Sequence, residues 1–267
     1  MGSRRVVDQY DLVIFDLDGV IYLGDQVVPK APAAVARLRR DGIAVAFATN
    51  NASRRPYQVA DILNAMDVAA RTEEVFTSAR AAASALAGLF PPGSPVLVVG
   101  AQALRDEVAE VGLTVVDSAD ELPVAVVQGY GPQVGWAQLA EACVAIRAGA
   151  VWVATNTDAT LPTPRGPLPG NGSLVMALAH ALGRSPDHEI GKPQPTLFVD
   201  ALAAAGARRA LVVGDRLDTD IAGAHRAGMD SLLVLTGVNT ARDAELADAE
   251  QRPTYVADDL DGLWEKR

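Results

Sequence analysis

The sequence predicts an α/β fold in which a doubly wound parallel sheet is interrupted by a second, inserted α/β unit. Short apolar runs alternate along the chain with segments whose apolar residues have helical spacing. Strands and helices that alternate in this way form parallel sheets with crossover helices. Two stretches rich in proline and glycine, 90–95 and 183–186, interrupt the alternation. We therefore expect a Rossmann-like core at 1–89 and 187–267, with an inserted α/β domain at 90–186.

The core is predicted to open with a buried strand at 12–16. The run LVIF is apolar at every position, which is typical of a strand buried on both faces. β-Forming residues around a Gly-Asp pair predict a hairpin at 20–29. Helical spacing followed by Asp-Gly predicts a helix at 32–40. Similar patterns predict strands at 43–48 and 75–78, a helix at 54–66 and an alanine-rich helix that ends near Leu89.

The alternation restarts after residue 95 and predicts the inserted unit. Its strands are expected at 96–100, 113–116, 124–128 and 151–154, and its helices at 101–111, 136–147 and 173–182. Residues 155–172 are rich in proline and threonine, and we expect a long loop there. The core is then predicted to resume with helices at 196–205, 220–227 and 241–250 and strands at 210–214, 231–235 and 255–256.

Composition restricts the classes of protein that the chain can represent. The 267 residues carry a formal net charge of −10, which argues against nucleic acid as a partner. No apolar run is long enough for a membrane helix, and no apolar signal core precedes the first strand. The lone cysteine, Cys143, excludes an intrachain disulfide. We therefore expect a cytoplasmic protein that binds neither nucleic acid nor membrane.

Asp16 and Asp18 directly follow the first predicted strand. Two carboxylates at the exit of a buried strand are unfavourable unless they hold a cation or take part in chemistry. Ligand sites of open α/β sheets lie at the carboxyl ends of the strands, which is where these two residues are expected. The alternative is a polar turn in which Gly19 supplies a positive φ.

Two further polar segments follow an apolar strand or lie in a constrained turn. Thr49, Asn50 and Asn51 follow the strand at 43–48 and can donate hydrogen bonds to a phosphoryl group, or can form a turn and a helix cap. Lys192 lies between glycine and proline in a chain that otherwise favours arginine, which suggests a fixed ammonium, although a surface turn is the alternative.

The strand at 210–214 also runs into acidic residues. Asp215 can complete a hard-cation site with Asp16. Asp220 begins the next predicted helix and can act as its N-cap, or it can accept a hydrogen bond from Lys192 or from a metal-bound water.

These four segments, in this order, resemble the motifs of the haloacid dehalogenase-like superfamily: DLDGV, Thr-Asn-Asn, Gly-Lys-Pro and GDRLDTDI. An insertion between the second and third motifs is the position of a type-2 cap in that superfamily. The segments ATNN, VFTSA, TNTD, PGNGS, IGKP and VGDRLDTDI are similar to the NagD-like subfamily. The resemblance extends from about residue 11 to 238.

The resemblance implies a phosphatase with an aspartyl-phosphate intermediate. Asp16 is then the nucleophile, and Asp18 is the general acid and base. The phosphate-binding residues are Thr49, Asn50, Asn51 and Lys192. Mg²⁺ is expected to bind Asp16, Asp215 and the main-chain carbonyl of Asp18. Asp220 is expected to accept a hydrogen bond from Lys192 or from a metal-bound water.

The resemblance also implies that the cap covers this cluster and selects the substrate. We expect the specificity loop at 155–172, with Asp158 and Arg165 as its candidate ligand residues, whereas a connection without a ligand role is the alternative. We also expect a homodimer formed through the cap.

The substrate is expected to be a small phosphorylated metabolite. The loop PTPRGPLPGNGS resembles that of bacterial glycerol-3-phosphate phosphatases. Phosphoglycolate, pyridoxal phosphate and nitrophenyl phosphate are the alternative substrates. A phosphotransferase or mutase on the same core and a catalytically inactive scaffold are the alternative functions.

Overall fold

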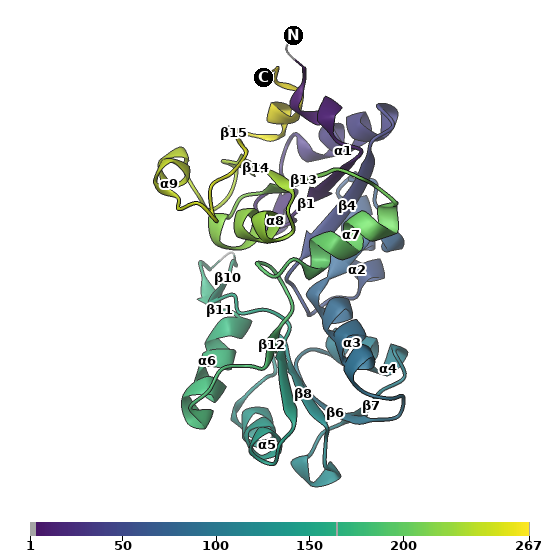
Figure 1. The fold of residues 1–267 in the computed structure, drawn as a ribbon, viewed down its shortest axis with the longest axis vertical. Coiled ribbons are helices and arrows are strands. Elements are labelled where there is room, and N and C mark those ends of the chain that lie inside the picture. Colours follow the sequence, from purple (N-terminus) through teal and green to yellow (C-terminus); the bar gives the residue numbers. More distant parts are fainter. Residues whose placement is uncertain (1–3, 164, 267) are drawn as a thin grey trace. The chain divides into compact units, whose positions relative to one another are not determined.

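The computed structural model describes residues 4–163 and 165–266, which form two compact units (Figure 1). The first unit contains the chain up to Thr49, Tyr57–Phe76 and the chain from Lys192 onward. The second contains Asn50–Pro56 and Thr77–Gly191. Each unit has its own parallel sheet, and the predicted fold class is confirmed.

Within the described residues, the first unit has a six-stranded sheet in the order β15-β14-β13-β1-β4-β5. Strand β1 pairs in parallel with β13 and β4, and β14 pairs in parallel with β13 and β15. The bounds are Leu12–Phe15 (β1), Ala44–Thr49 (β4), Val75–Thr77 (β5), Ala210–Gly214 (β13), Asp230–Val234 (β14) and Tyr255–Ala257 (β15).

The strand order reverses between β1 and β13. From β1 the chain continues outward to β4 and β5, and after β13 it continues outward to β14 and β15 on the other side. In open α/β sheets, ligands bind outside the carboxyl ends of the strands at such a reversal. The topology therefore favours a site where β1 and β13 end.

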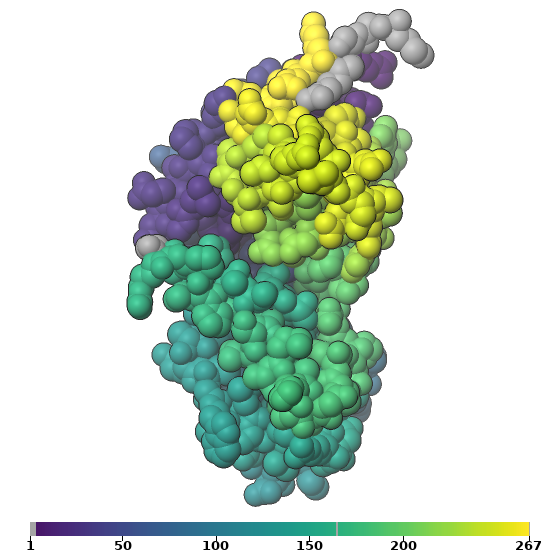
Figure 2. All heavy atoms as spheres, turned by 90° about the vertical axis from the view of Figure 1, so that its left-hand side faces the viewer, coloured from purple at the N-terminus to yellow at the C-terminus, as the bar shows by residue number. Residues whose placement is uncertain are grey.

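Both faces of the first sheet are covered. Val13 and Phe15 share a core cluster with Val35 and Leu38 of α1, whereas α7 contacts β1 and β4. The helices are Ala31–Arg40 (α1), Pro56–Ala65 (α2), Thr196–Ala205 (α7), Ala222–Arg226 (α8) and Ala241–Leu246 (α9). Shorter elements are the 3-10 helices Val6–Gln9, Thr72–Glu74 and Leu260–Trp264, the π-helix Leu217–Ile221, and the hairpin of β2 (Tyr22–Leu23) with β3 (Gln26–Val27). Helix α9 and the residues after it form a continuous yellow area on the surface of this unit (Figure 2).

The second unit is built on a five-stranded parallel sheet in the described residues, with the order β12-β9-β8-β6-β7. Its core surrounds the fully buried Trp152, and the partly buried Cys143 packs against that core. The strands are Pro95–Val99 (β6), Thr114–Val116 (β7), Ala125–Gln128 (β8), Val151–Ala154 (β9) and His188–Glu189 (β12). The helices are Ser78–Leu89 (α3), Gln102–Glu110 (α4), Trp136–Arg147 (α5) and Asn171–Leu182 (α6), with the 3-10 helix Ala119–Glu121.

Several predicted elements need correction. Residues 155–172 contain the antiparallel hairpin of β10 (Thr160–Leu161) and β11 (Leu168–Pro169), and their last two residues begin α6. The first two residues of the helix predicted at 220–227 belong to the π-helix, and the α-helix begins at Ala222 and ends at Arg226. The helix predicted at 241–250 ends at Leu246. Two-residue strands are too short to have a periodic pattern, and helix ends depend on local contacts.

The division between the units differs from the predicted ranges. Helix α3, placed in the core by the sequence, buries Ala79, Ala83 and Leu86 and packs against α4 in the second unit. Since the proline-rich stretch at 90–95 lies after α3, it does not mark the point where the contacts change. Among the described residues, none of the helices has the length and apolar character required to cross a membrane.

Candidate active site

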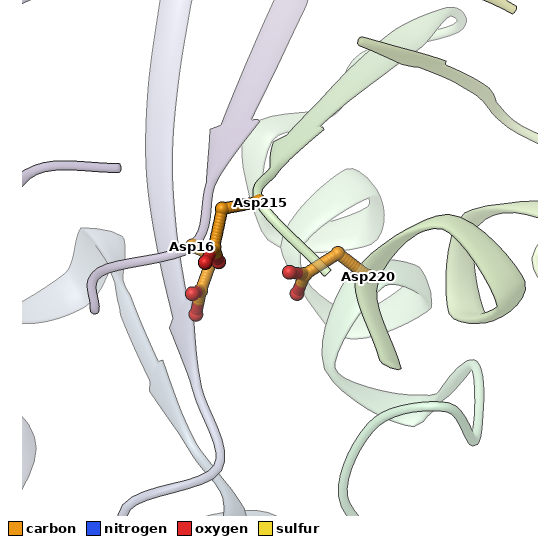
Figure 3. A group of neighbouring side chains, drawn as sticks. All are labelled: Asp16, Asp215 and Asp220. Atoms are coloured by element: carbon orange, nitrogen blue, oxygen red, sulfur yellow. The ribbon is translucent and has the colours of Figure 1, made fainter. Parts of the chain in front are cut away.

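Three buried carboxylates meet at the reversal of the strand order. Asp16 directly follows β1, Asp215 follows β13 and Asp220 lies in the π-helix. One oxygen from each lies within 4.8 Å of the other two, and the side chains point toward one another (Figure 3). The N–H of Asp16 donates to the carbonyl of Val213 at 2.9 Å, which keeps Asp16 in register with β13.

Lys192 supplies a positive charge to this cluster. Its Nζ donates to Asp16 Oδ1, to Asp220 Oδ1 at 2.8 Å and to the carbonyl of Ala48 at 3.3 Å. Only 4% of the residue is exposed. Burial lowers the pKa of Lys192, but the charges of Asp16 and Asp220 outweigh it, so the pKa is raised. The ammonium therefore stays protonated, as the sequence-based interpretation requires.

One ammonium does not balance three carboxylates. Burial raises the pKa of Asp16 well above its usual range; Lys192 opposes this rise, whereas Asp220 and Asp215 add to it. Burial, and then the charge of Asp220, raises the pKa of Asp215 to about 7. The cluster therefore has an excess of negative charge, which a bound cation would neutralise.

The hydrogen bonds distinguish Asp215 from Asp220. Among the described residues, the buried Oδ1 of Asp215 has no hydrogen-bond partner, whereas its Oδ2 accepts from the N–H of Val238 at 2.7 Å. Both oxygens of Asp220 are used, one by Lys192 and one by the N–H of Arg216 at 3.2 Å. This donor set fits a hard divalent cation with oxygen ligands. The oxygen left over belongs to Asp215, whose role as a ligand stays a prediction.

The turn after Asp16 packs directly on Asp215. Gly19 has φ +89°, and a Cβ there would lie 2.4 Å from Asp215 Oδ2. Its N–H donates to the carbonyl of Tyr22 at 2.8 Å, and Tyr22 is the first residue of the β2–β3 hairpin. Asp18 lies in this turn, two residues beyond Asp16, and is partly buried. Its roles in proton transfer and cation binding stay predictions.

The second predicted segment divides between the two units. Thr49 ends β4 and is 2% exposed in the first unit. Asn50 belongs to the second unit, where its Nδ2 donates to Asp158 Oδ2 at 3.0 Å and its carbonyl accepts from Ser78 Oγ at 2.6 Å. Asn51 Oδ1 accepts hydrogen bonds from Ser53. Phosphate binding by these residues stays a prediction.

The two candidate specificity residues differ in their surroundings. Asp158 is partly buried, and its carbonyl accepts from the N–H of Gly172 at 2.8 Å. Arg165 is exposed, and its N–H donates to Thr163 Oγ1 at 3.2 Å. Asp158 is therefore held by contacts inside the second unit. A ligand role for either residue stays a prediction.

Sequence reasoning did not single out the loop that follows β14. This loop, residues 235–240, holds Asp215 through the N–H of Val238, and Thr236 Oγ1 donates to the carbonyl of Gly19 at 2.6 Å. The signal was available, because TGVN follows an apolar strand as the other site segments do.

A buried carboxylate–lysine cluster at the reversal of a doubly wound sheet defines an α/β enzyme with a hard-cation site. The model of the haloacid dehalogenase-like hydrolases matches residues 13–114, and a second, HAD-hydrolase-like, model matches 189–263. The chain belongs to the haloacid dehalogenase-like hydrolases. The membership predicted from the four motifs, including the NagD-like phosphatases, is confirmed.

Similar proteins match almost the whole chain. The D-glycerol 3-phosphate phosphatase of Mycobacterium tuberculosis is 50% identical over 97% of this chain and 72% of its own length. The 5'-nucleotidase YutF of Bacillus subtilis is 39% identical over 94% of this chain and 96% of its own length. A solved structure of glycerol phosphate phosphatase from M. tuberculosis, in complex with magnesium, has a TM-score of 0.94 at 48% identity, covering 99% of this chain and 79% of that one.

Proposed function

We propose that this chain is a Mg²⁺-dependent phosphatase that hydrolyses a small phosphomonoester, with glycerol 3-phosphate as its preferred substrate. The observation that carries the proposal is the buried contact of Asp16 with Lys192, beside the Oδ1 of Asp215 that has no hydrogen-bond partner in the part of the chain that the structure describes. A nucleophilic carboxylate, an adjacent ammonium and a free carboxylate oxygen for a cation are what phosphoryl transfer needs. The choice of substrate is supported by the relative that is 50% identical.

In the first step, a carboxylate oxygen of Asp16 attacks phosphorus and forms an aspartyl phosphate. The bond from phosphorus to the ester oxygen breaks, and Asp18 protonates the departing alkoxide. Lys192 donates a hydrogen bond to Asp16 and holds its carboxylate in one orientation. The backbone pairing of Asp16 with Val213 fixes the strand end from which the attack is made.

In the second step, Asp18 takes a proton from water, and the water oxygen attacks phosphorus. The bond from phosphorus to the Asp16 oxygen breaks, which releases inorganic phosphate and restores the carboxylate. Thr49, Asn50, Asn51 and Lys192 are the residues proposed to hold the other phosphoryl oxygens. The same Asp18 therefore serves first as acid and then as base.

Mg²⁺ is proposed to bind the carboxylates of Asp16 and Asp215 and the main-chain carbonyl of Asp18. When bound, it neutralises charge on the phosphoryl group and on the surrounding carboxylates. Asp220 is not proposed as a ligand; it accepts a hydrogen bond from Lys192 and so fixes the ammonium beside Asp16. The pKa values of Asp16 and Asp215 are both raised, and these two carboxylates are the ones proposed as its side-chain ligands.

The second unit is proposed to select among small substrates. A site that hydrogen-bonds the hydroxyls of glycerol 3-phosphate should discriminate strongly against analogues that lack them. The loop at 155–172 supplies threonine hydroxyls and backbone donors. We propose Asp158 and Arg165 as the first residues to test there.

The direct test is a kinetic panel of phosphomonoesters. Glycerol 3-phosphate should give a higher kcat/KM than propyl phosphate, phosphoglycolate, pyridoxal phosphate, 4-nitrophenyl phosphate and a nucleoside 5'-monophosphate. Activity should disappear after chelation and return with Mg²⁺. A clear preference for another compound would contradict the glycerol 3-phosphate assignment alone, whereas the absence of hydrolysis of every compound would contradict the phosphatase itself.

Two further expectations concern the setting in which the enzyme works. We propose that it acts in the cytoplasm, and its single cysteine is compatible with a reducing compartment. A homodimer formed through the second unit stays a prediction, which sedimentation of the purified chain can test.

A further inference from the structure

The loop after β14, residues 235–240, contacts the candidate cation site at several points, although it lies outside the four motifs. The N–H of Val238 donates to Asp215 Oδ2 at 2.7 Å. The N–H of Asn239 donates to the carbonyl of Asp215 at 3.1 Å. This loop therefore holds both the side chain and the backbone of Asp215.

The side chain of Asn239 makes a second connection. Its Oδ1 accepts from the N–H of Leu217 at 2.9 Å, and its Nδ2 faces Asp243 Oδ2 at 3.4 Å. This orientation of the amide is the one its neighbours require, because the oxygen faces a donor and the nitrogen faces a carboxylate. Asn239 thus connects Asp215 to Leu217 and links both to helix α9.

Leu217 begins the π-helix that contains Asp220. Because Asn239 holds the backbone at both 215 and 217, it fixes the turn between the two acidic residues. A Cβ at Gly237 would lie 2.0 Å from Asp215 Oδ2, so the loop packs directly against that carboxylate. With Oδ2 bonded to the loop, the oxygen of Asp215 that has no partner among the described residues is Oδ1.

We propose that Asn239 is a positioning residue for the cation site. Through Leu217 and the backbone of Asp215, it holds the Asp215 carboxylate with Oδ1 free to bind the cation. This inference rests on the proposed Mg²⁺ dependence. Removal of groups that orient the ligands of a metal commonly weakens metal binding by about 10- to 100-fold.

The test is calorimetric titration of the metal-free, full-length enzyme with Mg²⁺, which does not depend on turnover. Asn239→Ala should raise the Kd for Mg²⁺ by about tenfold or more. Val238→Ala is the matched control on the same loop, because the residue is 65% exposed and its backbone N–H is retained. That control should change the Kd by less than about twofold.

Asn239→Asp is the second variant, and it remains informative if the alanine variant does not fold. It keeps an oxygen that accepts from Leu217, but it replaces the amide hydrogens that face Asp243 by a carboxylate oxygen and adds a negative charge there. Because added negative charge near the site does not disfavour a cation, its Kd should be no more than about threefold above that of the unaltered enzyme.

The possible results separate this inference from the proposed function. A Kd of Asn239→Ala equal to that of the unaltered enzyme would overturn the role of Asn239 and leave the phosphatase proposal standing. An equal loss in Asn239→Asp, or in Val238→Ala, would also overturn it. If the unaltered enzyme binds no Mg²⁺ in the same titration, both proposals are wrong.

Discussion

Lys192 is the group on which the buried carboxylates depend most. It is in contact with Asp16 and Asp220, and all three residues are buried. Removing one partner of a buried ion pair leaves the other charge uncompensated. Lys192→Met should therefore reduce the free energy of unfolding of the metal-free enzyme by about 3 kcal/mol and abolish phosphate release. Urea denaturation and an initial-rate assay measure the two effects.

Lys30 provides the matched control for Lys192. It also contacts two carboxylates, those of Asp259 and Asp261, but its side chain is 46% exposed. Exposed ion pairs contribute little because water and salt screen them. Lys30→Met should leave both unfolding and turnover almost unchanged. Equal effects of the two substitutions would show that burial of the Lys192 cluster does not matter.

The raised pKa of Asp215 predicts how stability depends on pH. Burial, together with the charge of Asp220, raises this pKa to about 7, whereas an unfolded aspartate has a pKa of about 4. Between these values the folded state binds more protons than the unfolded state. The contribution of Asp215 is thus fully present below about pH 4 and is lost as the pH rises through about 7.

Thermal unfolding of the metal-free enzyme should therefore show a pH-dependent loss of stability that Asp215→Asn removes. From pH 4 to 7, the Tm of the unaltered enzyme should fall relative to that of the variant. Mg²⁺ should stabilise the unaltered enzyme more at pH 7.5 than at pH 5, because it favours the ionised carboxylate. Parallel Tm curves for the two proteins would contradict the raised pKa.

The individual site residues were predictable to different extents. Asp16 and Asp215 follow apolar runs, so a rule about strand ends places them at one edge of the sheet. The contact of Lys192 with Asp16 joins residues far apart in the chain, and only the family resemblance indicated it. Asn239 acts through backbone groups of other residues, which composition and spacing do not reveal.

The start of helix α6 depends on an unusually close approach of two segments. A Cβ at Gly172 would lie 2.2 Å from the carbonyl oxygen of Thr157, and the N–H of Gly172 donates to Asp158. Gly172→Ala should therefore push α6 away from residues 157–158 and destabilise the protein by about 1–3 kcal/mol. It should also alter the ratio of kcat/KM values for glycerol 3-phosphate and propyl phosphate.

Gly88 offers a control for that substitution. It lies in α3, and a Cβ there would meet nothing within 4 Å. Gly88→Ala should be neutral or should stabilise the protein by up to about 1 kcal/mol, because alanine favours helix. If urea denaturation gives the same result for both variants, the close contact at Gly172 is not what constrains this segment.

Sequence patterns identified the longer elements and the hairpin of β2 and β3, but missed β10, β11, β12 and the 3-10 helices. The predicted bounds of α5, β9 and α7 agree with the structure because their patterns are long or strongly apolar. Asn171 and Gly172 were predicted as the end of the turn-rich stretch 155–172, but they begin α6. The N–H of Gly172 donates to the carbonyl of Asp158, and the amide of Asn171 donates to the carbonyls of Gln128 and Asn156. The π-helix, Leu217–Ile221, was not predicted; such single turns are rare and often lie at functional sites.

The alternation of strands and helices predicts that there are two units. It does not predict at which residues each unit begins and ends. Two of the points at which the chain changes from one unit to the other lie directly after Thr49 and directly before Lys192, which are both predicted site residues. Neither point lies in the proline- and glycine-rich stretches 90–95 and 183–186. The limits depend on which helix packs on which sheet, as α3 illustrates, and this is a property of contacts between distant parts of the chain.

The central claim is that Asp16 attacks the phosphoryl group, and it is tested most directly by phosphate release from glycerol 3-phosphate in the presence of Mg²⁺. Burial and two neighbouring carboxylates raise the pKa of Asp16, so Asp16→Asn removes a disfavoured charge and should still fold. The variant should lose kcat by at least about a thousandfold, because the covalent route is gone. If folded Asp16→Asn keeps even about a tenth of the kcat of the unaltered enzyme, Asp16 is not the nucleophile.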